Sequence, residues 1–146
     1  MYQVRQYKIT GVSPLLMHNG QLANPLNPIV KEVKKISGKR DKTEADLEEL
    51  ARLEWYGSLY LDQGKPCIPG EVLEATFING AKKRKRGNQA KAGVFCDENF
   101  PLIYDDSNGE KPDLKKMWDE GKYRFSTSVV IQRNRIIRTR PRFNIW

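Results

Sequence analysis

The pattern that most limits how this chain can fold lies near its C-terminus. β-forming side chains alternate from Tyr123 to Ile131, Arg133-Asn134 can form a turn, and the strand-like segment RIIRTRPRF follows. Alternation with period two places every second side chain on the same face of a strand. Two such runs joined by a short turn form a β-hairpin. The sequence therefore predicts a C-terminal hairpin with one apolar and one polar face.

Three earlier segments also have strand character. Tyr2–Val12 is rich in β-formers and stops at Gly11 and Ser13-Pro14, so we expect a first strand there. Asn-Gly and Asn-Pro steps make the next stretch a long, partly anchored loop. We expect a second hairpin from 59 to 68 that turns at Gln63-Gly64, and a strand over 101–106 that ends at an Asp-Asp-Ser-Asn-Gly turn.

Helical signals separate these strands. Thr43 followed by Asp46 is a capping pair, and the pattern that follows predicts a helix to about Tyr56. From Glu71 to Lys83 apolar residues recur at helical spacing, which predicts a core-facing helix. Shorter helical segments are expected over 31–36 and 114–118.

This order of elements predicts an α+β fold. We expect a ferredoxin-like or RRM-like antiparallel sheet with helices on one face and the C-terminal hairpin at its end. The 146 residues suffice for a single domain spanning 1–146 and are too few for two ordinary ones. No apolar segment suits a signal peptide or a membrane span, and the two cysteines lie far apart in sequence, so we expect a reduced, cytoplasmic protein.

The charge of the chain favours a polyanionic partner. Twenty-six Lys and Arg residues against eighteen Asp and Glu give a net charge of +8 and a pI near 9.5. A membrane surface would call for a basic amphipathic helix with a strong apolar face, and none is evident. Nucleic acid is the better candidate because the basic residues are clustered and interleaved with aromatic ones.

Three clusters carry most of this charge. The first follows the 71–83 helix in an exposed loop and consists of Lys82, Lys83, Arg84, Lys85, Arg86 and Lys91. The second lies in the C-terminal hairpin and consists of Arg133, Arg135, Arg138, Arg140 and Arg142. The third, from 31 to 42, consists of Lys31, Lys34, Lys35, Lys39, Arg40 and Lys42. We select the first two as the candidate nucleic-acid-binding residues.

In a strand, Arg138, Arg140 and Arg142 form a row on one face. Guanidinium groups fork onto phosphates and stack on bases, and Phe143 and Trp146 are close in sequence. An edge strand that uses charge against aggregation, or a helix end whose cations complement the helix dipole, would show similar patterns. An RRM-like fold can bring both clusters onto one nucleic-acid path.

Catalytic signals are sparse. His18 is the only histidine, and it can act as a general acid or base in metal-independent RNA cleavage. The acidic pairs near residues 97 and 105 are typical of turns, so we expect no metal site. No Gly-rich phosphate loop or hydrolase motif is present, and no cofactor is expected.

The stretch GKPCIPGEVLEATFINGAKK, with its Ile-Pro-Gly step at 68–70 leading into a helix, resembles the RAMP superfamily. These RRM-fold proteins form the backbone subunits of CRISPR effector complexes. The opening ITGVSPLLMHNG is similar to the family's first strand and the turn after it. The resemblance implies an RRM-like fold, binding along a nucleic-acid backbone and side-by-side assembly, as a homo-oligomer, a filament or a subunit of a CRISPR-type ribonucleoprotein. The family's catalytic aspartate has no counterpart here.

The leading hypothesis is a non-catalytic protein that binds RNA or single-stranded DNA, from a phage or mobile element. One alternative is a metal-independent endoribonuclease that uses His18. Another is a protein-interaction module, such as a phage inhibitor of a host defence complex.

Overall fold

The computed structural model describes residues 3–105, 107 and 110–146. The strands are β1 (Leu15–Leu16), β2 (Leu61–Asp62), β3 (Lys65–Ile68), β4 (Phe100–Pro101), β5 (Arg124–Ile131) and β6 (Asn134–Phe143). The helices are α1 (Pro28–Ser37), α2 (Glu44–Ser58), α3 (Gly70–Lys82), α4 (Gly87–Gly93) and α5 (Leu114–Glu120), with a 3₁₀ helix, η1 (Gly20–Ala23). Within the described part of the chain, no helix is both long and apolar enough to cross a membrane.

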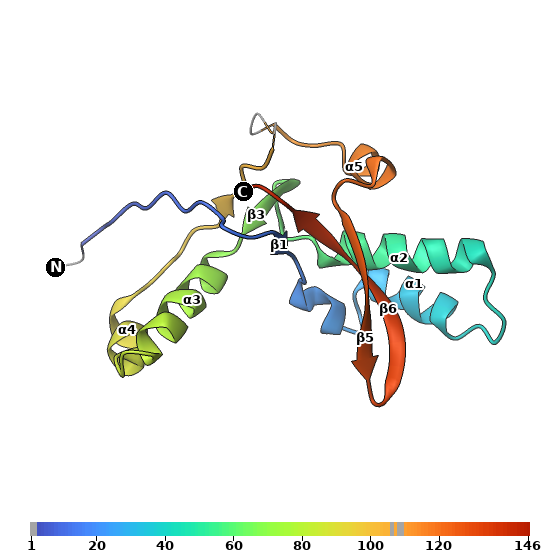
Figure 1. Cartoon of the computed structure of the whole chain (residues 1–146), viewed down its shortest axis with the longest axis horizontal. Helices are drawn as coiled ribbons and strands as arrows, with labels where there is room; N and C mark the ends of the chain where they lie inside the picture. The colour runs from blue at the N-terminus through green and yellow to red at the C-terminus, as the bar shows by residue number, and fades with distance from the viewer. Residues whose placement is uncertain (1–2, 106, 108–109) are drawn as a thin grey trace.

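The fold is mixed α+β, as predicted. The described strands pair in two antiparallel three-stranded sheets with the orders β1-β6-β5 and β2-β3-β4. Figure 1 shows α1, α2 and the β5–β6 hairpin in one half of an elongated molecule, with α3 and α4 projecting from the other half. Two small sheets do not confirm the ferredoxin-like arrangement.

The C-terminal hairpin is confirmed, with its turn one residue earlier than predicted. Its predicted division into one apolar and one polar face is wrong, because Phe125 and Val129 of β5 share a face with Arg138 and Arg140 of β6. β5 and β6 pair continuously from Arg124 opposite Pro141 to Ile131 opposite Asn134. The turn residues are Gln132 and Arg133, whose φ angles are 48° and 69°. Positive φ at both central positions is the signature of the type I′ turn, one of the common two-residue hairpin turns. A register shift by one residue would move every β6 side chain to the opposite face of the sheet.

The first strand was predicted in the wrong place. Residues 3–12 form no strand, and Tyr2 lies outside the described residues. Strand pairing begins at β1, where Leu15 lies opposite Phe143 and Leu16 opposite Arg142. The β-forming residues of the 3–12 segment have no neighbouring strand in the described chain, so their propensity alone does not produce a strand.

The strand predicted over 101–106 is also largely wrong. Only Phe100 and Pro101 pair with β3, and Asp106 lies outside the described residues. Leu102 and Tyr104 are each 6% exposed because they enter the core. One further backbone bond to β3 follows, in which the Leu102 N–H donates to the carbonyl of Pro66 at 3.0 Å, and beyond it packing of these two side chains takes over from strand pairing.

The predicted helix 43–56 is confirmed as α2. Thr43 Oγ1 accepts from the backbone N–H of Asp46, and the Asp46 carboxylate accepts from that of Thr43, which completes a capping box. The short segment predicted at 31–36 is the longer α1, whose N-terminus is capped by Asn27. The helical segment at 114–118 is α5, and the 59–68 hairpin is β2 and β3.

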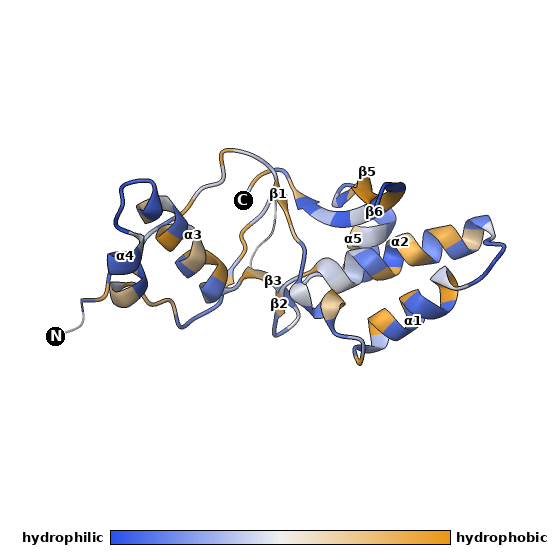
Figure 2. Cartoon of the chain, turned by 90° about the horizontal axis from the view of Figure 1, so that it is seen from below, coloured by the Kyte–Doolittle hydropathy of each residue, from blue (hydrophilic) through white to orange (hydrophobic). Residues whose placement is uncertain are grey.

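The bounds predicted for α3 are nearly correct, but its core-facing role is wrong. Gly70 is its only fully buried residue among those described, and Phe77 is 43% exposed. The apolar side chains of α3 therefore lie largely outside the core. In Figure 2 the apolar residues of α3 appear as orange bands on a helix that lies apart from α1, α2 and the hairpin. The loop predicted after α3 contains α4, because the chain turns at 83–86 and Ala and Lys residues favour a second short helix.

The core joins α2, α5 and the base of the C-terminal hairpin. Its buried members are Met17, Trp55, Leu59, Leu102, Tyr104, Met117, Trp118, Tyr123 and Phe143. Trp55 is fully buried, and its indole N–H donates to the backbone carbonyl of Tyr123 at 2.8 Å. The ring centroids of Tyr104 and Phe143 lie 4.8 Å apart. These contacts fix the base of the hairpin, and the rest of β5 and β6 extends from it.

Candidate nucleic-acid interface

The predicted row of arginines is present on β6. Because β6 is continuous over 134–143, Arg138, Arg140 and Arg142 lie on one face of the strand. All three are half-buried, whereas Arg133 and Arg135, near the turn, are exposed. Phe125 and Thr127 of β5 lie opposite Arg140 and Arg138. The face therefore combines three guanidinium groups with an aromatic ring and a hydroxyl group.

Arg138 is held by α2. Its Nη1 donates to one carboxylate oxygen of Glu54, and the other oxygen accepts from the backbone N–H of Thr139 at 3.2 Å. The Glu54 side chain is only 13% exposed. This carboxylate neutralises the Arg138 guanidinium and accepts a hydrogen bond from the outward-pointing backbone N–H of Thr139 at the edge of β6. No sequence pattern singles out Glu54, since one acidic residue in a charged helix resembles any other solvent-facing one.

Arg142 contacts an aromatic ring. Its guanidinium carbon lies 5.1 Å from the centroid of the Phe125 ring, within the range of a cation–π interaction. Its Nε is buried, and among the described residues it has no hydrogen-bond partner. A buried donor without a partner lowers stability.

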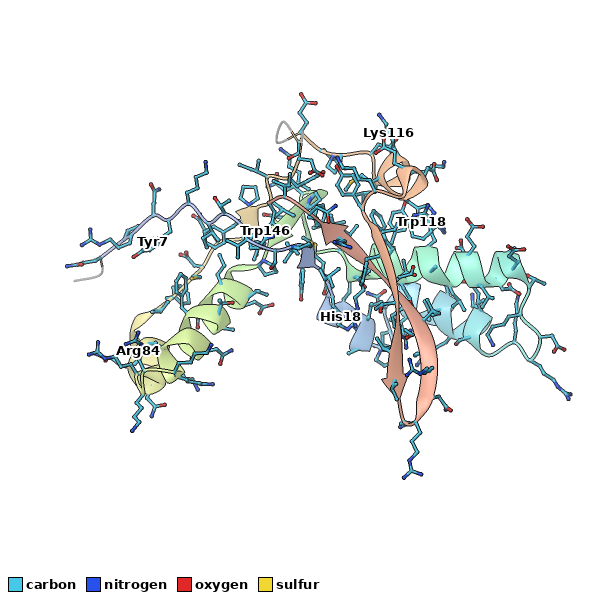
Figure 3. The ribbon with its side chains drawn as sticks, viewed as in Figure 1. Tyr7, His18, Arg84, Lys116, Trp118 and Trp146 are labelled. Atoms are coloured by element: carbon cyan, nitrogen blue, oxygen red, sulfur yellow. The ribbon has the colours of Figure 1, made fainter. Side chains whose placement is uncertain are left out.

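Arg140 lies between Arg138 and Arg142 in the row, and its positive charge affects the pKa of His18. Burial lowers the pKa of His18, the charges of Arg140 and Arg138 lower it further, and Glu54 opposes them. His18 comes close because it follows β1, which pairs with the end of β6. Figure 3 shows His18 beside the hairpin. The imidazole is therefore neutral near pH 7 and adds no positive charge to the row.

The aromatic residues expected to stack on bases are used by the fold. Phe143 is fully buried in the core. The Trp146 indole N–H donates to the carbonyl of Ser13 at 2.8 Å, and its ring covers Gly11. Phe125 is the aromatic side chain that accompanies the arginines.

The lysine-rich cluster lies elsewhere. Its members Lys82, Lys83, Arg84, Lys85, Arg86 and Lys91 are all exposed, at the end of α3, in the turn after it and on α4. A groove of about 410 Å³ between α3 and α4 is lined partly by Lys82, Lys91, Asn79 and Asn88. Figure 3 places Arg84 at the far end of this projection, away from His18. The chain alone therefore does not bring both clusters onto one short path.

The third cluster is partly neutralised within the fold. Lys35 pairs with Glu32 at 2.6 Å on α1, and Lys39 pairs with Asp46 at 2.6 Å. By contrast, no ion pair within the described ranges involves Arg140, Arg142 or the lysine-rich cluster.

The described residues contain no candidate metal site. Nowhere among them do three or more His, Cys, Asp or Glu side chains lie close enough together to hold a metal ion. The thiol pKa values of Cys67 and Cys96 are raised by burial, helped by nearby carboxylates, so neither is activated as a thiolate.

Comparison of the chain with protein-family models, with curated proteins and with solved structures finds no match. Its function is therefore inferred from its own residues and their arrangement.

Proposed function

We propose that this chain is a non-catalytic protein that binds RNA or single-stranded DNA through the phosphate backbone. The observation that supports this most is the pair Arg140 and Arg142 on one face of β6, with no carboxylate paired to either in the described chain. Cations that the fold leaves unneutralised on a sheet are free to bind an external anion.

The geometry of the row suits a phosphate backbone. The Arg142 guanidinium lies over the Phe125 ring, with its carbon 5.1 Å from the ring centroid, and its terminal N–H groups can donate in a fork to two phosphate oxygens. Arg140 lies two residues away on the same face, roughly 7 Å along the strand. Phe125 offers a π-face on which an unstacked base can pack.

The lysine-rich cluster supplies a second contact in this proposal. Its residues are exposed, and two of them, Lys82 and Lys91, line the groove between α3 and α4. Mobile lysines contact phosphates without reading sequence, so they add affinity that falls with rising salt. A strand long enough to reach both ends of the molecule would engage both clusters.

A RAMP-like fold and assembly along the strand belong to the same proposal. β3 ends at Ile68, Pro69 is the N-cap and α3 begins at Gly70, which is the strand-to-helix step on which the resemblance rests. A Cβ on residue 70 would lie only 2.5 Å from the backbone carbonyl oxygens of Cys96 and Glu98. This close approach explains why the residue at this position is a glycine. Subunits of CRISPR-type ribonucleoproteins would be the partners.

The first test is whether nucleic acid accompanies the protein. Protein purified at low salt should show a raised ratio of 260 to 280 nm absorbance, and digestion with RNase or DNase should identify the acid. A labelled single strand should be retained at low salt and released as salt rises. No retention at low salt would contradict the proposal.

A second candidate function is metal-independent RNA cleavage, favoured by the position of His18 beside Arg140 and Arg138. A neutral imidazole can accept the 2′-hydroxyl proton as the 2′-oxygen bonds to phosphorus, and Arg140 can stabilise the negative charge on the non-bridging oxygens. The bond from phosphorus to the 5′-oxygen breaks, and that oxygen takes a proton from the imidazolium or from water. Incubation of RNA with the protein and a chelator, and with a His18→Ala variant, tests this. Cleavage by the parent alone would support it, and intact RNA with both proteins would exclude it.

A further inference from the structure

The N-terminal segment, residues 3–10, is an arm with the composition of a strand that pairs with no strand among the described residues. The exposed fractions of its apolar side chains and of the nearby Val12 are 87% for Val4, 74% for Tyr7, 45% for Ile9 and 101% for Val12. Its one aromatic contact in the described chain is with α3, where the Tyr7 and Phe77 ring centroids lie 6.4 Å apart. Apolar, β-forming side chains left this open gain free energy when a partner covers them.

The root of the arm is fixed. The N–H of Gly11 donates to the carbonyl of Trp146 at 2.7 Å, and the Trp146 ring occupies the place that a Cβ of residue 11 would take. The arm therefore leaves the fold at a defined point. Figures 1 and 2 both show it running on the α3 and α4 side of the molecule, away from the hairpin.

The same molecule presents a long free strand edge. β5 has β6 as its only neighbour among the described strands, and with eight residues it is much longer than the two-residue edge strands β1, β2 and β4. In a two-residue hairpin the pair that flanks the turn is hydrogen-bonded, and the bonding alternates from there. The backbone groups of Ser126, Ser128 and Val130 therefore point away from β6.

Pairing on the other edge of the hairpin supports this assignment. Thr139, opposite Ser126, donates its N–H outward to Glu54, and Pro141 accepts outward from Met17. The outer edge of β5 has no such cover in the described chain, and Val130 is 62% exposed. An uncovered edge of this length is a template for another strand.

We propose that the arm of one copy adds as a strand to the outer edge of β5 in a second copy. The arm is long enough for this, because residues 3–10 span about 26 Å when extended, which covers the eight residues of β5. The arm and β5 lie on different sides of one molecule, so the exchange joins separate copies head to tail. Such contacts build an open chain of subunits or a ring.

Two proline variants test the exchange. Lys8→Pro breaks the arm as a strand, with Lys8→Ala as its control. Ser128→Pro removes an N–H that does not bond to β6 and blocks the outer edge, and Ser128→Thr is its control. Masses are measured by sedimentation over a range of concentrations, after nuclease treatment and at high salt, so that nucleic acid does not contribute.

The parent and both controls should grow beyond the 16.9 kDa of one chain as concentration rises, and each proline variant should remain that size. A mixture of the two proline variants should form a complex of two chains only, because one supplies a working edge and the other a working arm. Amide exchange at Ser126, Ser128 and Val130 should slow as the parent associates.

A parent that stays monomeric at all concentrations would overturn the proposal. This result would also be seen if another protein, and not a second copy, covers the outer edge of β5. Proline variants that associate like the parent, or a mixture of them that stays monomeric, would also overturn it. These measurements do not depend on nucleic-acid binding, so they can fail while the proposed function holds.

Discussion

The Glu54 carboxylate joins α2 to β6 by accepting from the Arg138 guanidinium with one oxygen. Its other oxygen accepts from the neighbouring backbone N–H on β6. One of the three arginines in the row is therefore committed to the fold, which leaves Arg140 and Arg142 as the cations available to a ligand. Loss of the Arg138 contact should therefore mainly lower stability, whereas loss of Arg140 and Arg142 should mainly weaken binding.

The Glu54 contact should stabilise the protein. Glu54→Ala leaves Arg138 half-buried without its partner and leaves the Thr139 N–H without an acceptor, so we expect a loss of about 1–3 kcal/mol in the free energy of unfolding. Glu54→Gln keeps an acceptor for the N–H and should lose less. Denaturant titrations measure both. Equal stability of Glu54→Ala and the parent would show that the contact contributes nothing.

Gly70 and Gly80, both on α3, should respond in opposite directions to alanine. A Cβ at residue 70 meets two backbone carbonyl oxygens at 2.5 Å, which cannot move without shifting the 96–98 segment, so Gly70→Ala should destabilise by about 1–3 kcal/mol. A Cβ at residue 80 meets nothing within 4 Å, and Gly80→Ala should stabilise by about 0.5–1 kcal/mol. Thermal unfolding of both variants tests the pair, and a destabilised Gly80→Ala would show that α3 packs differently.

His18 should titrate below the ordinary histidine pKa of about 6.5. Burial and then the charges of Arg140 and Arg138 lower its pKa, so Arg140→Ala should raise it and Arg135→Ala, whose charge is not among these causes, should not. As the only histidine, it gives one imidazole signal in a proton NMR titration. An unchanged pKa in Arg140→Ala would contradict the placement of His18 beside the row.

The same shift sets a direction for stability. Because the folded pKa of His18 is lower than the unfolded value, the unfolded chain takes up this proton first as pH falls. The contribution of His18 to stability is therefore full above about pH 6.5 and declines as pH falls from there towards the folded pKa. His18→Gln should remove this part of the pH dependence.

Local signals in the sequence predicted the elements they encode, and long-range packing decided the rest. The capping pair Thr43 and Asp46 and the alternation of β5 and β6 are contained within each segment, so α2 and the hairpin are confirmed. The 3–12 segment has strand propensity, but a strand also needs a neighbour, and the described chain provides none. The periodicity of α3 indicates a helix and does not reveal how little of it the core covers.

The candidate site shows the same division. The row of Arg138, Arg140 and Arg142 follows from period two and is predictable from the sequence. Neither the neutralisation of Arg138 by Glu54 nor the proximity of His18 is predictable, because both join residues that are far apart in the chain. The separation of the lysine-rich cluster from the row depends on where α3 points, which no local pattern specifies.

The most direct measurement of the central claim is the salt dependence of binding to a labelled single strand. It compares the parent with Arg140→Ala/Arg142→Ala and with Lys115→Ala/Lys116→Ala, a control that removes the same charge from exposed residues of α5. We expect the arginine variant to bind more weakly, with a slope of log affinity against log salt that is shallower by about 1.4, or about 0.7 for each lost phosphate contact. The control should keep the parent's slope. Equal affinity and slope in all three proteins would contradict the assignment of Arg140 and Arg142 to the phosphate backbone.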